Sequence, residues 1–341
     1  MLEENDELRA APLELDMAIG SDGLTRDEIV SVAVAAEHAG LKNFWVTEGT
    51  GRDAFSVLTS VALATQRIGL GTGIVNIFAR TPTATAQAAA SLMELMGDRT
   101  FNLGLGASGK ALIEKFHGIP FEHPMARMQE FIQIVDQIFK TGKVPAEGTV
   151  FKTQDVKTGV RADRSRLKIF VAGLTPRTIQ ITGEYADGWL PIWPSKSRGM
   201  EALATLRSAA EGAGREMPTV AAYIYGVVSD DPKLVQLVRG TLAWYLAANG
   251  VAYRNMFNRM GYEREANEIC DLWTEGKRDE ARQIVNQEML EDTSLFGDVQ
   301  QFEQSVQEFR AAGIDRPILR FPEGTPMQDI LNMLGKLNQS A

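Results

Sequence analysis

Two short stretches of this sequence combine residue types that can bind an anion. NLGLGASGKA contains Gly106 to Gly109, and FVAGLTPRT contains Gly173 to Thr175; each follows an apolar run and precedes an expected helix. Backbone N–H groups and the helix dipole favour an anion at such a place. Each stretch alone also fits an ordinary tight turn, with Thr175 capping the helix and Pro176 in its first turn. The two together favour phosphate binding.

A carboxylate, Glu48, directly follows the run FWVT and has no basic neighbour in the sequence. It could give or take a proton in catalysis, although a capping or solvated glutamate is the more common role. The histidines lack the spacing of a zinc site, no G-x-S-x-G elbow is present, and Cys270 is the only cysteine. The sequence therefore predicts neither a metal site nor a covalent nucleophile. Glycine backbone, one carboxylate and aromatic rings suit a bound redox cofactor.

The stretch GLGTGIVNIFARTP, residues 69–82, has glycines at alternate positions. A dinucleotide fingerprint needs G-x-G-x-x-G opening directly into a helix. Here three other residues follow Gly73, and the next helix starts no earlier than Thr81 and Pro82. The spacing therefore excludes a dinucleotide loop and leaves open what the glycines accommodate.

Apolar runs alternate with amphipathic segments along the chain, which indicates repeated β-α units. Several runs are continuously apolar, as are strands buried on both faces of a parallel sheet. Eight such units in 341 residues favour a (β/α)8 TIM barrel over an open doubly wound sheet. The predicted strands are 14–19, 43–46, 67–73, 101–106, 168–173, 188–193, 220–228 and 316–321.

The whole chain, residues 1–341, is predicted to be one barrel domain with two insertions. The segment 250–292 is helical by pattern and is predicted as a helical insertion before the last strand. The segment 140–165 carries the glycine-bounded EGTVFK and is predicted as a small hairpin or loop excursion.

In such a barrel the active site lies at the carboxyl ends of the strands, in the loops that follow them. This rule places the two glycine turns and Glu48 at one end of the barrel and adds residues from other loops. The loop after the first strand contributes Gly20 to Asp22. The predicted substrate pocket consists of Trp193, Lys196, Tyr225 and Arg320.

Composition argues against several kinds of partner. Asp and Glu number 44 against 35 Lys and Arg, the net charge is −9, and the basic residues are scattered. Nucleic acid and anionic membranes require a clustered basic patch, so neither is expected. The longest apolar run is far short of the roughly 20 residues that span a bilayer. The acidic start has no apolar signal core and the chain has one cysteine, so a cytoplasmic protein that acts on a small molecule is expected.

The order FWVTEGTGRDAFSVLTSVALATQRIGLGTGIVNIFARTP, FNLGLGASGKALIEKFHGIPFEHPMARMQEFIQIV and IFVAGLTPRTIQITGEYADGWLP resembles the bacterial luciferase-like family of flavin- and deazaflavin-dependent oxidoreductases. The similarity runs through nearly the whole chain. GTGIVNIFARTP, GASGKA and the late segment NQEMLEDTSLFGDVQQFEQSVQEFRAAGIDRPILRF are similar to the branch that uses the deazaflavin coenzyme F420, which includes the methylenetetrahydromethanopterin reductases.

The resemblance implies a non-prolyl cis peptide bond between Gly73 and Ile74 that presses against one face of the cofactor ring. It also implies that the backbone of the two glycine turns holds the phosphate tail, and that the protein is a homodimer. Many relatives have Asp-His where this chain has Glu48 and Gly49, and Lys110 replaces an acidic residue, so proton delivery and the substrate are left open. The implied cofactor-binding residues are Thr47, Gly73, Ile74, Val75, Asn76, Gly106, Ala107, Ser108, Gly109, Gly173, Leu174 and Thr175.

The predicted function is hydride transfer between F420 and a small organic substrate, with Glu48 as the catalytic proton donor or acceptor. One alternative is a monooxygenase of the same family that uses reduced FMN, and oxygen consumption separates the two. A second alternative, prompted by the missing histidine and by Lys110, is a barrel that binds a flavin without catalysis.

Overall fold

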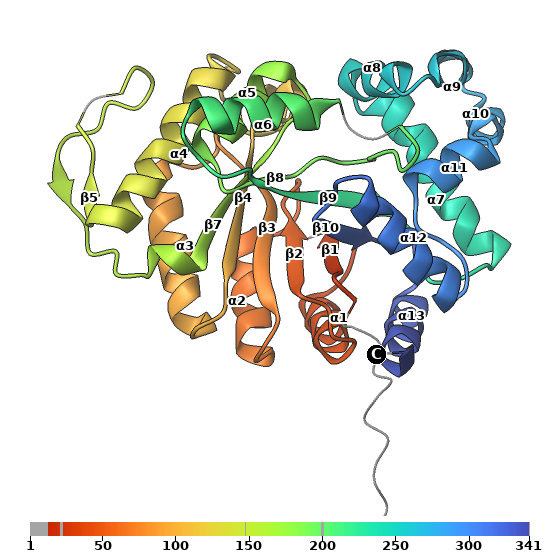
Figure 1. Cartoon of the computed structure of the whole chain (residues 1–341), viewed down its shortest axis with the longest axis horizontal. Helices are drawn as coiled ribbons and strands as arrows, with labels where there is room; N and C mark the ends of the chain where they lie inside the picture. Colours follow the sequence, from red (N-terminus) through yellow and green to blue (C-terminus); the bar gives the residue numbers. More distant parts are fainter. Residues whose placement is uncertain (1–12, 21–22, 147, 199–200, 341) are drawn as a thin grey trace, which may run out of the picture.

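Eight parallel strands close into a barrel in the order β1-β10-β9-β8-β7-β4-β3-β2 (Figure 1). The computed structural model describes residues 13–20, 23–146, 148–198 and 201–340. The predicted TIM barrel is confirmed. Its strands are β1 (Asp16–Gly20), β2 (Asn43–Thr47), β3 (Gly69–Asn76), β4 (Phe101–Gly106), β7 (Leu167–Ala172), β8 (Gly188–Trp189), β9 (Thr219–Tyr225) and β10 (Arg316–Arg320).

Helices surround the barrel, and several begin at the capping residues that the sequence indicates. Thr25 and Glu28 form a capping box, and the hydroxyls of Thr81 and Thr175 each accept a backbone N–H bond ahead of a first-turn proline. These helices are α1 (Arg26–His38), α2 (Ala54–Ala64), α3 (Pro82–Met96), α4 (Pro124–Thr141), α5 (Pro176–Tyr185), α6 (Ala202–Gly212), α7 (Pro232–Ala248), α12 (Val299–Ala311) and α13 (Met327–Ser340).

Two segments extend beyond this pattern, on opposite sides of the molecule (Figure 1). The strands β5 (Lys143–Val144) and β6 (Val156–Lys157) pair as an antiparallel hairpin. Between β9 and α12 the chain forms four further helices after α7, as the pattern of residues 250–292 indicates. They are α8 (Val251–Arg259), α9 (Glu263–Thr274), α10 (Arg278–Ile284) and α11 (Gln287–Thr293).

Two expected elements are shorter than the sequence suggests. The predicted strand 188–193 is reduced to β8, with an isolated bridge between Ile192 and Tyr223, because Pro191 has no N–H to continue the ladder. The helix expected in GKALIEKF covers only residues 110–116, and its last part is a π-helical turn, η1 (Leu112–Phe116).

The barrel interior is filled in layers by alternate strand residues. At the amino ends of the strands, Asn43 Nδ2 donates to Asp16 Oδ1 at 2.8 Å and Asn102 Nδ2 donates to Asn43 Oδ1 at 2.8 Å. Trp45 Nε1 donates to Asp16 Oδ2 at 2.9 Å. Burial raises the pKa of Asp16 to about 6. The next layer is an apolar cluster of Ala18, Trp45, Phe170, Leu190, Ala221, Tyr223 and Ile318.

The alternating glycines of β3 face this interior. A Cβ atom at Gly71 would overlap the indole ring of Trp45, and one at Gly73 would overlap the hydroxyl of Tyr223. Both large side chains fill the barrel, so the strand beside them has room only for glycine. The glycines of GLGTG therefore accommodate packing inside the barrel.

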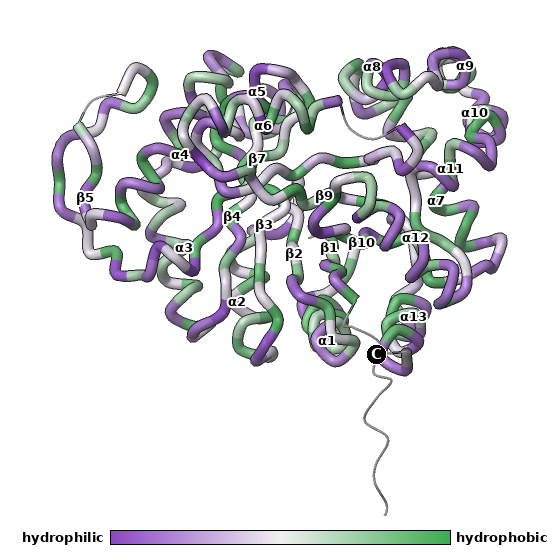
Figure 2. The backbone as a smooth tube through the Cα atoms, viewed as in Figure 1, coloured by the Kyte–Doolittle hydropathy of each residue, from purple (hydrophilic) through white to green (hydrophobic). Residues whose placement is uncertain are grey.

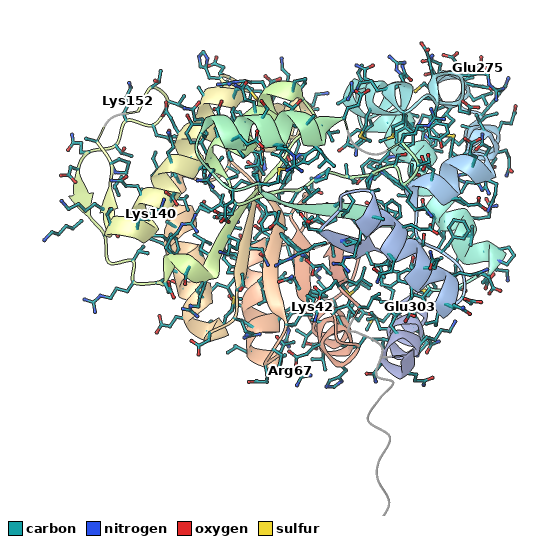
Figure 3. All side chains as sticks on the ribbon, viewed as in Figure 1. Lys42, Arg67, Lys140, Lys152, Glu275 and Glu303 are labelled. Carbon is teal, nitrogen blue, oxygen red and sulfur yellow. The ribbon has the colours of Figure 1, made fainter. Side chains whose placement is uncertain are left out.

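Hydrophilic residues dominate the outer turns, such as those of α9 and α10 (Figure 2). The charged side chains of Lys140, Lys152 and Glu275 lie at the periphery of the molecule (Figure 3). Among the described helices, none has the length and apolar character needed to cross a membrane. In the same residues, no group of three or more His, Cys, Asp or Glu side chains could hold a metal ion.

Candidate active site

A ring of residues at the carboxyl ends of the strands lies one layer above the apolar cluster. Side chains alternate along a strand, so the residue two positions after an inward-facing one also faces inward. Ile318 of the cluster is thus followed by Arg320, Tyr223 by Tyr225. Ile74 also faces inward, because the register of β3 shifts between Thr72 and Val75. The mouth ring consists of Gly20, Thr47, Ile74, Gly106, Ala172, Ile192, Tyr225 and Arg320.

The predicted cis peptide bond between Gly73 and Ile74 is present. Tyr223 Oη donates to Gly73 O at 3.3 Å, and Glu48 N donates to Ile74 O at 3.4 Å. Burial raises the pKa of Tyr223, which keeps its hydroxyl protonated as a donor. Ile74 packs on the inner cluster, and a Cβ at Gly106 would overlap its side chain. This strand end is therefore held from below by Tyr223 and from the side by β2 and β4.

The two glycine turns lie side by side because β4 and β7 are neighbours, with Gly106 opposite Ala172. Within the described residues, the N–H groups of Ala107, Ser108 and Gly109 donate no backbone hydrogen bond, and neither do those of Gly173, Leu174 and Thr175. Ser108 has a left-handed backbone, with φ 59°. Only the second turn opens a helix of more than two turns, α5. The first turn also precedes a helix, as predicted, but this helix is short and covers residues 110–116.

The sequence neighbours of Glu48 suggest an isolated carboxylate, but the structure gives it partners from other parts of the chain. Arg80 Nη2 donates to Glu48 Oε2 at 2.9 Å, and Ala54 N donates to the same oxygen at 2.8 Å. Arg80 also pairs with Asp53 and lies over the ring of Phe55. The Glu48 side chain is 12% exposed. The carboxylate thus caps the start of α2 and is charge-compensated, while its second oxygen, Oε1, has no protein partner among the described residues.

Aromatic rings line the side of the mouth formed by β8, β9 and β10. Trp193 stacks on Tyr225 with ring centroids 4.8 Å apart, and the hydroxyls of Tyr225 and Tyr245 are 3.0 Å apart. Tyr253 of α8 packs edge-on against Tyr245 of α7. The guanidinium of Arg320 lies 5.3 Å from the ring centre of Tyr225. Trp193, Tyr225 and Arg320 of the predicted substrate pocket are thus brought together.

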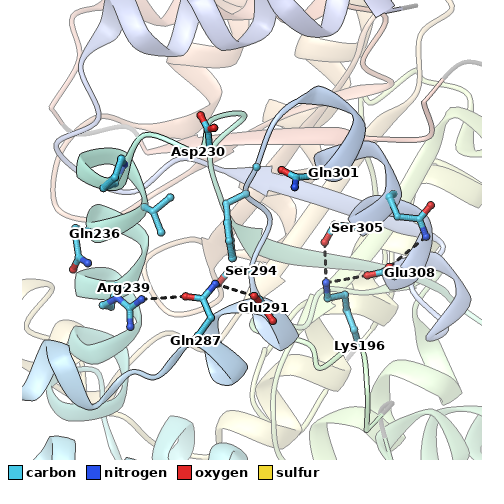
Figure 4. A pocket seen from close by; sticks show the side chains of 15 residues that line it. Lys196, Asp230, Gln236, Arg239, Gln287, Glu291, Ser294, Gln301, Ser305 and Glu308 are labelled. Atoms are coloured by element: carbon cyan, nitrogen blue, oxygen red, sulfur yellow. Dashed lines mark hydrogen bonds and ion pairs between the residues drawn. The ribbon is translucent and has the colours of Figure 1, made fainter.

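Lys196, the fourth residue predicted there, is directed elsewhere. Its Nζ donates to Ser305 Oγ at 2.9 Å and to Glu308 Oε2 at 3.0 Å, both on α12 (Figure 4). The ammonium also lies over the ring of Phe309. It lines a separate pocket of about 570 Å³ between α7, α11 and α12. The placement of Lys196 in the substrate pocket is therefore corrected: the loop after β8 turns this side chain outward.

Three residues near the mouth were missed by the sequence reasoning. Asn76 Oδ1 accepts N–H bonds from Phe78 and Ala79, which turns its Nδ2 toward His117 Nε2 at 3.3 Å. The three missed residues are His117, Arg80 and Tyr245, whereas Asn76 belongs to the predicted cofactor-binding residues. Only Arg80 carried a usable signal, since it follows β3 at the same end of the barrel as Glu48. Of the predicted loop Gly20 to Asp22, Ser21 and Asp22 lie outside the described residues.

Comparisons with known proteins agree on the family. A family model described as luciferase-like monooxygenase matches residues 10–316. The chain is 31% identical over 320 residues, 88% of this chain and 92% of the relative, to a Mycobacterium tuberculosis protein named "Putative coenzyme F420-dependent oxidoreductase". It is 27% identical over 308 residues, 88% and 91% of the two chains, to the 5,10-methylenetetrahydromethanopterin reductase of Archaeoglobus fulgidus.

A solved structure has the same fold. The coenzyme F420-dependent tetrahydromethanopterin reductase of Methanopyrus kandleri superposes with a TM-score of 0.83 at 23% identity, covering 96% of this chain and 98% of that one.

Proposed function

This chain belongs to the luciferase-like monooxygenase family of enzymes, and from that premise we propose that it is an oxidoreductase that uses coenzyme F420. The proposed reaction is transfer of a hydride between the deazaflavin and a small organic substrate at the mouth of the barrel. The relatives named as F420-dependent enzymes support the cofactor. The observation in this chain that carries the proposal is the pair of adjacent turns after β4 and β7.

The residues at the mouth fit a phosphate-bearing tricyclic cofactor. The unbonded N–H groups of Ala107 to Gly109 and of Gly173 to Thr175 would hold the phosphate of its tail. A Cβ atom at Gly73 or Gly106 would overlap a neighbouring side chain, so both positions require glycine. Ile74, Val75 and Asn76 would line one face of the ring, with Thr47 beside them. When bound, a deazaflavin supplies or accepts a hydride and does not activate oxygen.

The protein groups have the tasks of positioning and proton transfer. Tyr223 fixes the carbonyl of Gly73, and the aromatic rings beside Trp193 exclude water from one side of the mouth. We propose Glu48 Oε1 as the atom that accepts or returns a proton, because Oε2 already receives two hydrogen bonds. Arg80 holds that carboxylate in place.

The test is turnover of a substrate panel with F420, followed by the visible absorbance of the deazaflavin with and without air. The proposal predicts absorbance changes that do not depend on oxygen. The family model's description, luciferase-like monooxygenase, favours the second candidate, a reduced-FMN monooxygenase. Oxygen uptake with reduced FMN, and no turnover with F420, would select that candidate.

We further propose that the protein is a homodimer in the cytoplasm. The helix α2 contains no charged residue, and Leu63 on it is 66% exposed. Leu95 on the adjacent helix α3 is 45% exposed. Exposed apolar side chains on an uncharged helix surface are typical of subunit interfaces. The cytoplasmic location is proposed from the single cysteine, which permits no internal disulfide.

A further inference from the structure

We propose that Arg320 binds a carboxylate of the substrate, so that the enzyme acts on a small organic acid with a flat or apolar body. This inference rests on the proposed function, which leaves the substrate class open. It concerns the side of the mouth formed by β8, β9 and β10. β8 adjoins β7, and β10, which carries Arg320, lies across the barrel from β4.

Arg320 occupies the last position of β10, in register with Tyr225 on β9 and Ala18 on β1. Ile318, two residues earlier, lies in the apolar cluster inside the barrel. The alternation of strand side chains therefore directs Arg320 inward at the carboxyl end, where TIM-barrel enzymes bind their substrates. Most of its neighbours in the mouth ring are small or aliphatic.

The half-buried guanidinium of Arg320 has no hydrogen-bond or ion-pair partner among the residues that the structure describes. Its contact there is with the ring face of Tyr225. An arginine stays charged at neutral pH, and a charge removed from water needs compensation. The nearby carboxylate of Glu323 acts on Arg320 electrostatically, but it is exposed and forms no ion pair with Arg320 among the described residues. Arg320 is thus available to an anion.

The planar fork of arginine matches a carboxylate through two parallel N–H bonds. A single unpaired cation fits a monoanion better than it fits a doubly charged phosphate. The N–H-rich turns after β4 and β7 suit the phosphate better. The rings of Trp193, Tyr225 and Tyr245 are almost fully buried and pack together beside Arg320, so the surroundings of the guanidinium are apolar on this side. Apolar surroundings favour a planar or apolar body next to the carboxylate.

The probes are benzoate and benzamide, which have the same ring and differ in the charged group. Their dissociation constants are measured by titration calorimetry with the F420-loaded protein and with the cofactor-free protein. Benzoate is expected to bind at least about ten-fold more tightly than benzamide, as a charge-assisted bidentate pair predicts. Arg320→Gln should abolish this preference. Arg320→Lys keeps the charge but loses the planar fork, so it should retain part of the preference for benzoate.

Lys196→Gln is the matched control, because it removes a cation that pairs with α12 away from the mouth, and it should keep the full preference. Equal binding of the two probes to the wild type, or a preference that survives in Arg320→Gln, would overturn the proposal. So would a loss of F420 affinity in Arg320→Gln without a change for benzoate, since Arg320 would then hold the cofactor. If F420 does not bind at all, the proposed function fails, and the cofactor-free titration still decides the role of Arg320.

Discussion

At the scale of single residues, the contact between Gly73 and Tyr223 determines what the end of β3 tolerates. Gly73→Ala places a Cβ on the Tyr223 hydroxyl, so it should destabilise the protein by about 1–3 kcal/mol, as overpacking does. Tyr223→Phe alone should cost about 1 kcal/mol through the lost bond to Gly73 O. Because Phe lacks the obstructing oxygen, the double variant should be more stable than the sum of the two costs predicts. Urea unfolding gives the free energy of unfolding of the two single variants and of the double variant. If the two single costs add exactly in the double variant, the contact between Gly73 and Tyr223 is refuted.

Glu48 is the second residue whose role can be measured. Glu48→Gln should lower kcat by about 10²–10⁴-fold if Oε1 exchanges the proton, while the dissociation constant of F420 stays within about three-fold. Stopped-flow turnover and F420 fluorescence give the two numbers. Glu211→Gln, an exposed glutamate on α6, is the control and should leave both unchanged. An unaltered kcat in Glu48→Gln would leave the carboxylate with the capping role that its bond to Ala54 N shows.

At the scale of elements, the buried polar chain from Asp16 to Asn102 ties β1, β2 and β4 together at the amino ends of the strands. Burial raises the pKa of Asp16 to about 6 from an unfolded value of 3.8, so the folded state holds this proton more tightly. Stability from this group is therefore full below pH 4 and is lost as the pH rises through 6, by at most about 3 kcal/mol.

The measurement is the free energy of unfolding of wild type and Asp16→Asn between pH 4 and 7. Asp16→Asn cannot ionise, so its curve should lack the fall that the wild type shows in this interval. At low pH the variant should be less stable than the wild type. The side-chain NH2 that Asp16→Asn introduces would face Asn43 Nδ2 or Trp45 Nε1, which are themselves donors. Parallel curves for the two proteins would show that Asp16 does not titrate in this window.

How far the sequence predicts these elements depends on the range of the interactions. The starts of α1, α3 and α5 follow from local capping residues, and the barrel follows from eight repeated β-α units. The pairing of Glu48 with Arg80 joins residues 32 positions apart and becomes visible only when β2 and β3 lie side by side. The direction of Lys196 depends on the contact with α12, more than a hundred residues away. Spacing alone specifies neither contact.

At the scale of the whole molecule, the exposed leucines of α2 and α3, Leu63 and Leu95, bear on assembly. Leu63→Glu puts a charge into the proposed interface, and should convert a dimer to a monomer in light scattering after size-exclusion chromatography. Val156→Glu is the matched control, because Val156 is 54% exposed on the β5–β6 hairpin, away from α2. A wild type that is monomeric at micromolar concentration, or a Leu63→Glu variant that remains dimeric, would refute this interface.

The choice of cofactor tests the account of the whole barrel most directly. Purified protein is titrated with F420 and with FMN under the same buffer and salt, and binding is followed by the fluorescence of each compound. The account predicts that F420 binds at least about ten-fold more tightly, a difference of about 1.4 kcal/mol. FMN binding that is equal or tighter, together with oxygen uptake when the FMN is reduced, would contradict it.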